Sequence, residues 1–251
     1  MAANPLVLIP VYNEGPSVRK VLEELFTHYR GAVLAVDDGS TDETASELQR
    51  FPTVRVLRHP VNLGYGRALR DGFEYARAAG HDIVVTMDCD EQHEPAQVSE
   101  FLERIEATGV DIVSGSRYLV PPTEAELRQV PPERLRINRL ITEVINGLTG
   151  WSLTDAFCGF KAYRVDSLTR LSLDEPGYGM PLQLWLQAWQ AGLRIEEIPV
   201  PLIYVPNFER RFGGSLDDAA TRLRYYLRVI GEELSKIEGR LPCSMDGCRV
   251  G

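Results

Sequence analysis

The sequence predicts an α/β fold in which helices cover a mostly parallel central sheet. Short apolar runs alternate with helix-like segments as far as Gly115, a pattern typical of parallel strands joined by crossover helices. Polar residues follow several of these runs, and open parallel sheets bind ligands beyond the carboxyl ends of their strands. The length of 251 residues, with 44% hydrophobic and 25% charged residues, suits one such domain with an appendage.

The strands and helices follow from the spacing of apolar residues. Apolar runs predict strands at residues 6–9, 33–36, 54–57, 83–86 and 111–115. Helical periodicity covers residues 18–26, 43–51, 68–76, 95–107, 135–148 and 219–234. Pro16 suits the first turn of the first helix, and Ser40 with Glu43 resembles a capping box that opens the second. Three βα units followed by a fourth strand thus precede residue 90.

The regular alternation stops after the fifth strand. Two proline pairs bracket an acidic stretch, and we expect a flexible insertion at about 119–134. The main domain then spans 1–216, a C-terminal amphipathic helix spans 217–238, and 239–251 form a tail. The apolar stripe of that helix fits packing against the domain, contact with a membrane surface, or contact with a partner.

Bulk composition excludes several classes of function. The net charge of −9 argues against a nucleic-acid-binding protein, which normally carries a basic surface patch. A nucleotide remains a suitable small ligand. No apolar run approaches the roughly 20 residues of a membrane-spanning helix, and no signal peptide is evident. Four cysteines provide no disulfide framework. We therefore expect a cytoplasmic protein that works in solution or on the cytoplasmic face of the membrane.

Two carboxylates follow the fourth strand. Asp88 and Asp90 are two residues apart at the end of residues 83–86, so they can share one hard cation through oxygen ligands. Magnesium fits this pattern best, with manganese next. Cys89 points the other way if strand alternation persists, which favours packing in the core. The alternative is a solvated loop whose carboxylates cap the next helix.

An ordered set of motifs resembles the signature of family-2 glycosyltransferases. The set comprises Pro10-Val11-Tyr12-Asn13-Glu14, Val36-Asp37-Asp38-Gly39-Ser40-Thr41-Asp42, Asn62-Leu63-Gly64 and Asp88-Cys89-Asp90. The segments 90–95 and 115–118 resemble the dolichyl- or polyprenyl-phosphate mannosyltransferase branch and its glucosyl counterparts. The resemblance covers about residues 5–215 and implies a GT-A fold, a Rossmann-like nucleotide-sugar domain.

The resemblance also implies roles for individual residues on the donor side. The base, ribose and diphosphate of a nucleotide sugar would be held by Pro10, Tyr12, Glu14, Asp37, Asp38, Gly64 and Asp88. The metal would be held by Asp88, Asp90 and Gln92. Carboxylates can accept hydrogen bonds from ribose hydroxyls, and a tyrosine ring offers a stacking face.

The acceptor side rests on a second motif. Asp155 to Tyr163 resembles the Asp-x-x-x-Gly-Phe-Arg/Lys motif of the family. Asp155 would accept a proton from an acceptor hydroxyl or, with a lipid phosphate, orient the substrates. Arg117 and Arg210 suit phosphate recognition because a guanidinium makes forked hydrogen bonds. Gln183 and Leu216 depart from the residues that relatives often carry, glutamate and lysine respectively.

These observations predict an inverting hexosyltransferase in which Asp90, Asp155, Arg117 and Arg210 carry the reaction. The predicted donor is GDP-mannose or UDP-glucose, and the predicted acceptor is a polyprenyl phosphate, reached by peripheral membrane contact or through an integral membrane partner. Two alternatives remain: a glycosyltransferase with a soluble hydroxyl acceptor, and a non-catalytic nucleotide-sugar-binding protein.

Overall fold

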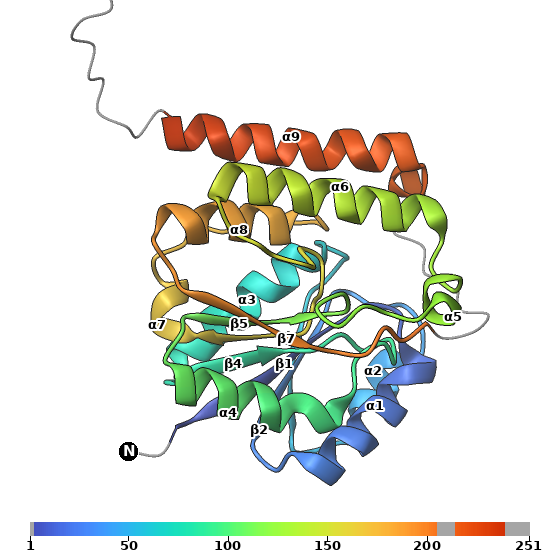
Figure 1. Ribbon diagram of the computed structural model, residues 1–251. Coiled ribbons are helices and arrows are strands. Elements are labelled where there is room, and N and C mark those ends of the chain that lie inside the picture. Colours follow the sequence, from blue (N-terminus) through green and yellow to red (C-terminus); the bar gives the residue numbers. More distant parts are fainter. Residues whose placement is uncertain (1–2, 205–213, 239–251) are drawn as a thin grey trace, which may run out of the picture.

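The computed structural model describes residues 3–204 and 214–238, and within them helices surround a seven-stranded sheet (Figure 1). The strands lie in the order β3-β2-β1-β4-β6-β5-β7. Their bounds are β1 Pro5–Val11, β2 Ala32–Asp37, β3 Val54–Arg58, β4 Ile83–Thr86, β5 Ile112–Ser116, β6 Lys161–Arg164 and β7 Ile195–Pro199.

The first four strands confirm the sequence prediction. β1 pairs in parallel with β2 and β4, and β2 pairs in parallel with β3. These strands are almost continuously apolar because helices cover both faces of the sheet. Along β1, Val7 and Ile9 contribute to the core on one face, whereas Leu6 and Leu8 contribute to the core on the other.

β6 and β7 are not predicted from the sequence. β6 has the sequence Lys-Ala-Tyr-Arg, and because charged residues stand at both ends it contains no apolar run that would predict a strand. It runs antiparallel between β4 and β5, with Lys161 paired to both Thr86 and Ser114. Since an antiparallel strand enters where its neighbour ends, residues 155–160 lie beside the carboxyl end of β4. This insertion joins the two predicted halves of the site.

The helices form layers on both faces of the sheet (Figure 1). Their bounds are α1 Gly15–His28, α2 Thr44–Leu48, α3 Tyr65–Ala78, α4 Val98–Thr108, α5 Glu124–Leu127, α6 Pro132–Thr149, α7 Val165–Leu168, α8 Met180–Gln190 and α9 Ala219–Glu238, with short 3₁₀ turns at Pro95–Gln97 and Gly214–Asp217. Helices α1 and α4 cover one face, α3 and α8 cover the other, and α6 and α9 form an outer layer over α8.

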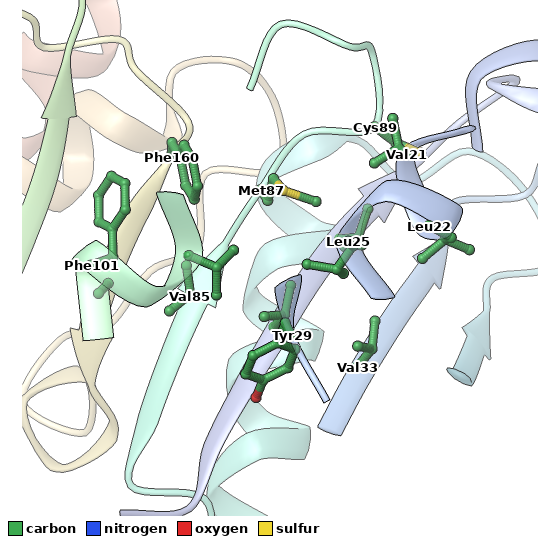
Figure 2. Close-up of a cluster of buried hydrophobic side chains, with 14 of the residues drawn as sticks. Val21, Leu22, Leu25, Tyr29, Val33, Val85, Met87, Cys89, Phe101 and Phe160 are labelled. Carbon is green, nitrogen blue, oxygen red and sulfur yellow. The ribbon is translucent and has the colours of Figure 1, made fainter. Parts of the chain in front are cut away.

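The core on the α1 and α4 face is shown in Figure 2. Leu22 and Leu25 of α1 and Phe101 of α4 are all fully buried there. Cys89, 2% exposed, belongs to the same core, which confirms its predicted orientation. Burial raises the pKa of the Cys89 thiol well above its ordinary value, so this side chain is an unreactive packing group.

A third core lies among α6, α8 and α9. Tyr226 and Ile230 of α9 are buried in it, so the predicted apolar stripe packs against the domain. Leu227 of the same helix is 45% exposed, so not every apolar residue of α9 faces the domain. Arg222, near the start of α9, is 6% exposed and donates a hydrogen bond to the carbonyl oxygen of Leu216 at 2.8 Å.

The predicted capping box is wrong. α2 begins at Thr44, and Glu43 makes no side-chain capping bond. The Ser40 hydroxyl accepts a hydrogen bond from the Asn13 amide at 2.9 Å instead, because two loops meet there.

The stretch 119–134 contains α5, whose capping box joins Thr123 and Glu126. In the described part of the chain, no helix combines the length and apolar character needed to cross a bilayer.

Candidate functional site

Three predicted site segments meet at the carboxyl edge of the parallel strands. Val11 at the end of β1 pairs with Asp37 at the end of β2. The amide of Met87, which follows β4, donates to the carbonyl oxygen of Leu8 in β1 at 3.0 Å. The loop after β1, Asp37 and Asp88 therefore lie along one edge of the sheet, as predicted.

The loops after β1 and β2 are fastened to each other. Asn13 has a left-handed backbone with a φ of 53°. Its side-chain oxygen accepts a hydrogen bond from the Thr41 amide at 2.8 Å. This arrangement leaves Tyr12 45% exposed, so its ring is accessible for stacking. Glu14 accepts a hydrogen bond from the Ser17 hydroxyl at 2.7 Å, and Pro10 is partly exposed at the end of β1.

Asp37 and Asp38 are adjacent but have different environments. Asp37 is fully buried, and its Oδ1 accepts the Ser40 amide hydrogen at 2.9 Å. Among the described residues its Oδ2 makes no hydrogen bond, and Arg58 Nε lies 3.4 Å away. A buried carboxylate oxygen with remaining acceptor capacity suits a ribose hydroxyl or a base imino group.

Asp38, predicted in the donor set, bonds to the loop before α3. Its Oδ1 accepts the Leu63 amide hydrogen at 2.8 Å and its Oδ2 accepts the Gly64 amide hydrogen at 2.8 Å. His59 Nδ1 also lies 2.7 Å from Oδ1. Because both oxygens hold the loop before α3, the structure gives Asp38 a role in building the site. His59, which the sequence prediction missed, is 5% exposed and joins Asp38 to Asp71.

Gly64 is required by backbone geometry. Its φ of 103° lies in a region that side chains avoid, and a Cβ there would be 2.4 Å from the carbonyl oxygen of Pro176. The amide of Arg67 donates to the same oxygen at 3.0 Å. The loop before α3 is therefore packed tightly against the segment before α8.

Asp88 and Asp90 are nearly buried, at 9% and 3% exposure. The Asp88 amide donates to Nδ1 of His93 at 2.9 Å, which places the neutral imidazole proton on Nε2. The Tyr65 hydroxyl donates to Oδ1 of Asp88 at 3.2 Å. The Gln92 amide donates to Oδ1 of Asp90 at 3.1 Å. Each carboxylate is thus held by its own loop or by α3.

The donor set at this loop fits a divalent cation bound together with a diphosphate. In residues 3–204 and 214–238, no group of three or more His, Cys, Asp or Glu side chains could hold a metal alone. Magnesium, however, is commonly held by one or two carboxylates, with phosphates and water completing its octahedron. Asp88 and Asp90 supply such a pair of hard oxygen ligands, and manganese accepts the same ligands.

Arg117 and Asp155 form a forked ion pair. Arg117 Nε and Nη2 donate to the two carboxylate oxygens of Asp155 at 2.6 and 2.9 Å. The Phe157 amide also donates to Oδ1 of Asp155 at 3.1 Å. Burial alone would raise the pKa of Asp155, but the charge and hydrogen bonds of Arg117 outweigh it and hold the pKa below its usual range. Asp155 is a poor proton acceptor in this environment, which favours the orienting role of the two predicted.

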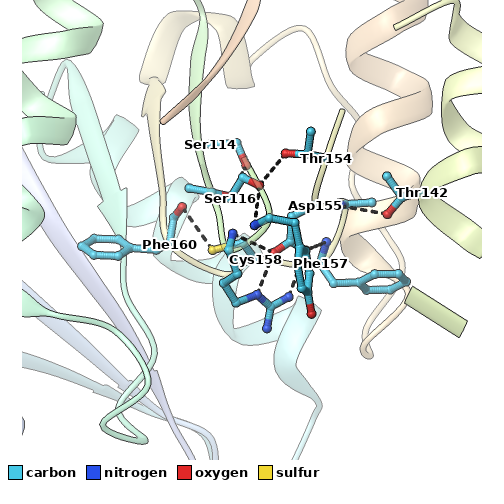
Figure 3. A network of polar contacts seen from close by, with 12 residues as sticks. Ser114, Ser116, Thr142, Thr154, Asp155, Phe157, Cys158 and Phe160 are labelled. Atoms are coloured by element: carbon cyan, nitrogen blue, oxygen red, sulfur yellow. Dashed lines mark hydrogen bonds and ion pairs between the residues drawn. The ribbon is translucent and has the colours of Figure 1, made fainter. Parts of the chain in front are cut away.

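The turn that carries Asp155 is held by Thr154 and Glu197, which the sequence prediction missed, and by Ser116. Figure 3 shows Ser116, Thr154 and Asp155 in one polar network. Glu197 of β7 accepts the Thr154 amide hydrogen at 2.8 Å and the Asp155 amide hydrogen at 3.1 Å. Ser116 and Thr154 join their hydroxyls at 2.5 Å. β5 and β7 thereby fix the position of the Asp155 turn.

The rest of the Asp155 motif lies against the Asp88 loop. A Cβ on Gly159 would be 2.6 Å from Oδ2 of Asp88, so glycine makes room for that carboxylate. Phe160 stacks on His93 with ring centroids 5.0 Å apart. Lys161 is 1% exposed, and its Nζ donates to the carbonyl oxygen of Cys158. Desolvation lowers the pKa of Lys161.

A pocket of about 60 Å³ lies between the two halves of the site. Its lining includes Asp88, Arg117, Arg134, Phe157, Tyr178 and Tyr226. Arg134, at the start of α6, is a further cation that no sequence motif indicates. A groove of about 330 Å³ also borders Arg117, with Val120, Pro121, Pro122, Pro201 and Leu202 among its walls. A larger cavity of about 420 Å³ between α3 and α7 contains none of the predicted site residues.

Some predicted features lie outside the described residues. Arg210 and the tail 239–251 are among them. Gln183, noted as a departure from relatives, is 1% exposed, and its side chain bonds to Asp174 and Glu233. It holds α8 to α9 and to the preceding segment.

Comparison with known proteins identifies relatives of this chain. The sequence model described as "Glycosyl transferase family 2" matches residues 6–172. An undecaprenyl-phosphate mannosyltransferase of Micrococcus luteus is 33% identical over 219 residues, covering 84% of this chain and 88% of that protein. A polyprenol monophosphomannose synthase of Mycolicibacterium smegmatis is 31% identical, covering 78% of this chain and 76% of that protein.

Solved structures share the fold at lower identity. Glucosyl-3-phosphoglycerate synthase from Mycobacterium tuberculosis in complex with UDP is 20% identical and superposes with a TM-score of 0.70, covering 98% of this chain and 83% of that chain. A second structure of that enzyme, with Mn²⁺, UDP and phosphoglyceric acid, gives a TM-score of 0.69 at 19% identity, covering 98% of this chain and 82% of that chain. These similarities confirm the predicted GT-A type of α/β fold.

Proposed function

The chain belongs to glycosyl transferase family 2, and we propose that it transfers a hexose from a nucleoside diphosphate sugar to a polyprenyl phosphate with inversion at the anomeric carbon. GDP-mannose and UDP-glucose are the proposed donors. The observation that carries the acceptor assignment is the position of Arg117, which borders both the small pocket and the apolar groove.

The donor half of the proposal rests on the carboxyl edge of the sheet. Asp37 offers a buried carboxylate to the base or ribose, and the exposed ring of Tyr12 offers a stacking face, with Pro10 and Glu14 beside it. Asp88 and Asp90, with Gln92 as a proposed third ligand, would hold Mg²⁺ or Mn²⁺. When bound, such a cation would offset the charge that develops on the departing diphosphate.

The acceptor half combines positive charge with apolar surface. Arg117 and Arg134 line the pocket that also contains Asp88, and guanidinium groups bind phosphate through charge-assisted hydrogen bonds. The groove that also borders Arg117 is walled mainly by prolines and aliphatic side chains, among them Val120, which is 63% exposed, with Gln97 and Glu126 as further polar members. A phosphate joined to an apolar chain matches this pair of surfaces. A polyprenyl phosphate would also bring the protein to the membrane surface.

The proposed reaction needs no strong base. An oxygen of the acceptor phosphate forms the new bond to the anomeric carbon, while the bond from that carbon to the diphosphate breaks on the opposite face. The phosphate oxyanion is already nucleophilic near neutral pH, so no proton must be removed. This agrees with the environment of Asp155, whose pKa is held low by Arg117. Asp155 would orient Arg117 toward the acceptor phosphate.

The test is transfer of labelled hexose from GDP-mannose or UDP-glucose to undecaprenyl phosphate in detergent micelles. Arg134→Ala should raise the KM for the lipid phosphate about tenfold or more, since a charge-assisted contact is lost. Arg136→Ala is the matched control, because Arg136 lies two residues away on α6 and is exposed. Transfer to soluble hydroxyl acceptors but not to the lipid phosphate would replace this acceptor. Donor binding without any transfer would favour a non-catalytic protein.

A further inference from the structure

We propose that Tyr65 is a positioning residue for Asp88 and that helix α9 holds Tyr65 in place through the segment 174–179. The inference rests on the proposed function, in which Asp88 binds the donor. It adds two groups that no motif assigns: the Tyr65 hydroxyl, and the Tyr225 hydroxyl of α9.

The Tyr65 hydroxyl contacts Asp88 from the first residue of α3. It donates to Oδ1 of Asp88 at 3.2 Å, and a Cβ on Gly159 would lie 2.9 Å from the same hydroxyl and 2.6 Å from Oδ2 of Asp88. The carboxylate is thus enclosed by α3 on one side and by the turn before β6 on the other. A hydrogen bond to one oxygen fixes the direction in which the other oxygen faces a ligand.

The ring of Tyr65 is held by the segment 174–179. Tyr178 stacks on it with ring centroids 5.6 Å apart and an interplanar angle of 17°. The backbones around the two rings are also in close contact, because a Cβ on Gly66 would be 2.3 Å from the carbonyl oxygen of Glu175. A shift of segment 174–179 would therefore move Tyr65.

Helix α9 fastens the same segment through Tyr225. The Tyr225 hydroxyl donates to Oε1 of Glu175 at 2.5 Å and accepts the Gly179 amide hydrogen at 2.9 Å. Glu175 also accepts the Gly177 amide hydrogen at 2.9 Å. One hydroxyl of α9 thus bonds to both ends of the turn that carries Tyr178.

A buried polar cluster fixes α9 about two turns further along. Glu233 is 3% exposed and accepts hydrogen bonds from Gln183 Nε2 at 2.6 Å and Gln187 Nε2 at 2.9 Å. Gln183 Oε1 in turn accepts the Asp174 and Glu175 amide hydrogens at 2.8 and 2.9 Å. The glutamine at position 183 is suited to this place, because its amide donates to α9 while its oxygen accepts from segment 174–179.

These contacts form a continuous path from α9 to the donor site. Tyr225 holds segment 174–179, Tyr178 of that segment holds the ring of Tyr65, and the hydroxyl of Tyr65 holds Asp88. Removing a hydroxyl at either end should loosen the carboxylate while leaving the cores of the domain intact. The C-terminal helix would then contribute to donor affinity without touching the donor.

The experiment is calorimetric titration of the full chain with GDP and UDP in the presence of Mn²⁺. Tyr65→Phe keeps the ring stacked on Tyr178 and removes the hydroxyl, and it should raise the nucleotide Kd about tenfold, the effect of one hydrogen bond to a charged group. Tyr225→Phe should raise the Kd in the same direction. The nucleotide Kd of the double variant should equal the larger of the two single-variant Kd values, because both changes act on one path. Steady-state kinetics should show a higher donor KM in both single variants.

Tyr75→Phe is the matched control, because Tyr75 lies on α3 and stacks on His81 away from Asp88. An unchanged Kd in Tyr65→Phe, with wild-type binding intact, would overturn the role of Tyr65 and leave the proposed function standing. Fully additive effects of the two variants would overturn the path through α9. A wild-type chain that binds no nucleoside diphosphate would overturn the proposed function and this inference together.

Discussion

The Arg117–Asp155 ion pair should contribute measurably to folding as well as to the proposed acceptor site. Asp155 is 1% exposed and the Arg117 side chain is 20% exposed, so removing the carboxylate charge leaves a guanidinium with little access to water. In Asp155→Asn the side-chain oxygen can still accept one bond, but the amide group would face Arg117. Breaking a buried pair from one side typically costs 3–5 kcal/mol. Because Arg117 retains some solvent contact, we expect a loss of about 3 kcal/mol.

The measurement is urea denaturation followed by circular dichroism, with the free energy of unfolding extrapolated to water. Asp166→Asn is the matched control, since Asp166 is exposed on α7, and it should change that free energy by less than about 0.5 kcal/mol. A loss below about 1 kcal/mol in Asp155→Asn would refute the reasoning. It would mean that desolvation of the two groups nearly cancels their attraction.

Three further predictions concern the same region. The low pKa of Asp155 adds stability above its unfolded value of about 3.9, and that stability is lost as the pH falls through the folded pKa, so unfolding curves should show an acid loss that Asp155→Asn lacks. Gly159→Ala should weaken nucleotide binding because its Cβ would displace Asp88, whereas equal affinity by calorimetry would exclude that contact. Gly64→Ala should lower the free energy of unfolding by about 1–3 kcal/mol, and an unchanged urea midpoint would contradict the strain argument.

Much of the donor half was predictable because it is built from local sequence. Each of the first four strands is a contiguous apolar run, and the residues that follow it must lie at the carboxyl edge. Asp37, Asp88 and the loop around Tyr12 are placed together by this topology alone. Their roles as ligands stay predictions.

The acceptor half could be predicted less well because long-range pairing builds it. β6 carries no apolar pattern of its own, yet its antiparallel insertion places Gly159 against Asp88. Arg117 and Asp155 are 38 residues apart in sequence, and only their side-chain geometry reveals a paired, rather than basic, carboxylate. The family resemblance placed Asp38 in the donor set, and only the structure shows that its carboxylate binds the amides of the loop before α3.

The path from α9 to Tyr65 has no sequence signature. Tyr225 and Glu175 are 50 residues apart, and each occurs in a segment whose pattern predicts only helix or loop. In the sequence Gln183 is only a departure from the glutamate that relatives often carry, whereas in the structure its side-chain amide bonds to both α9 and segment 174–179. The structural role of a polar residue of this kind can be assigned only from its hydrogen-bond partners.

The most direct test of the central claim, that the carboxyl edge of this sheet binds a nucleoside diphosphate sugar through Asp88 and Asp90, is the melting temperature with GDP, UDP, GDP-mannose or UDP-glucose, each with Mg²⁺, with Mn²⁺ and with chelator. A ligand at 100 times its Kd adds about 2.7 kcal/mol, or roughly 5–10 °C for a chain of this size. We expect that shift from one nucleotide family, only with metal, and its loss in Asp90→Asn. The absence of a shift with every nucleotide, or an equal shift in Asp90→Asn, would contradict the account.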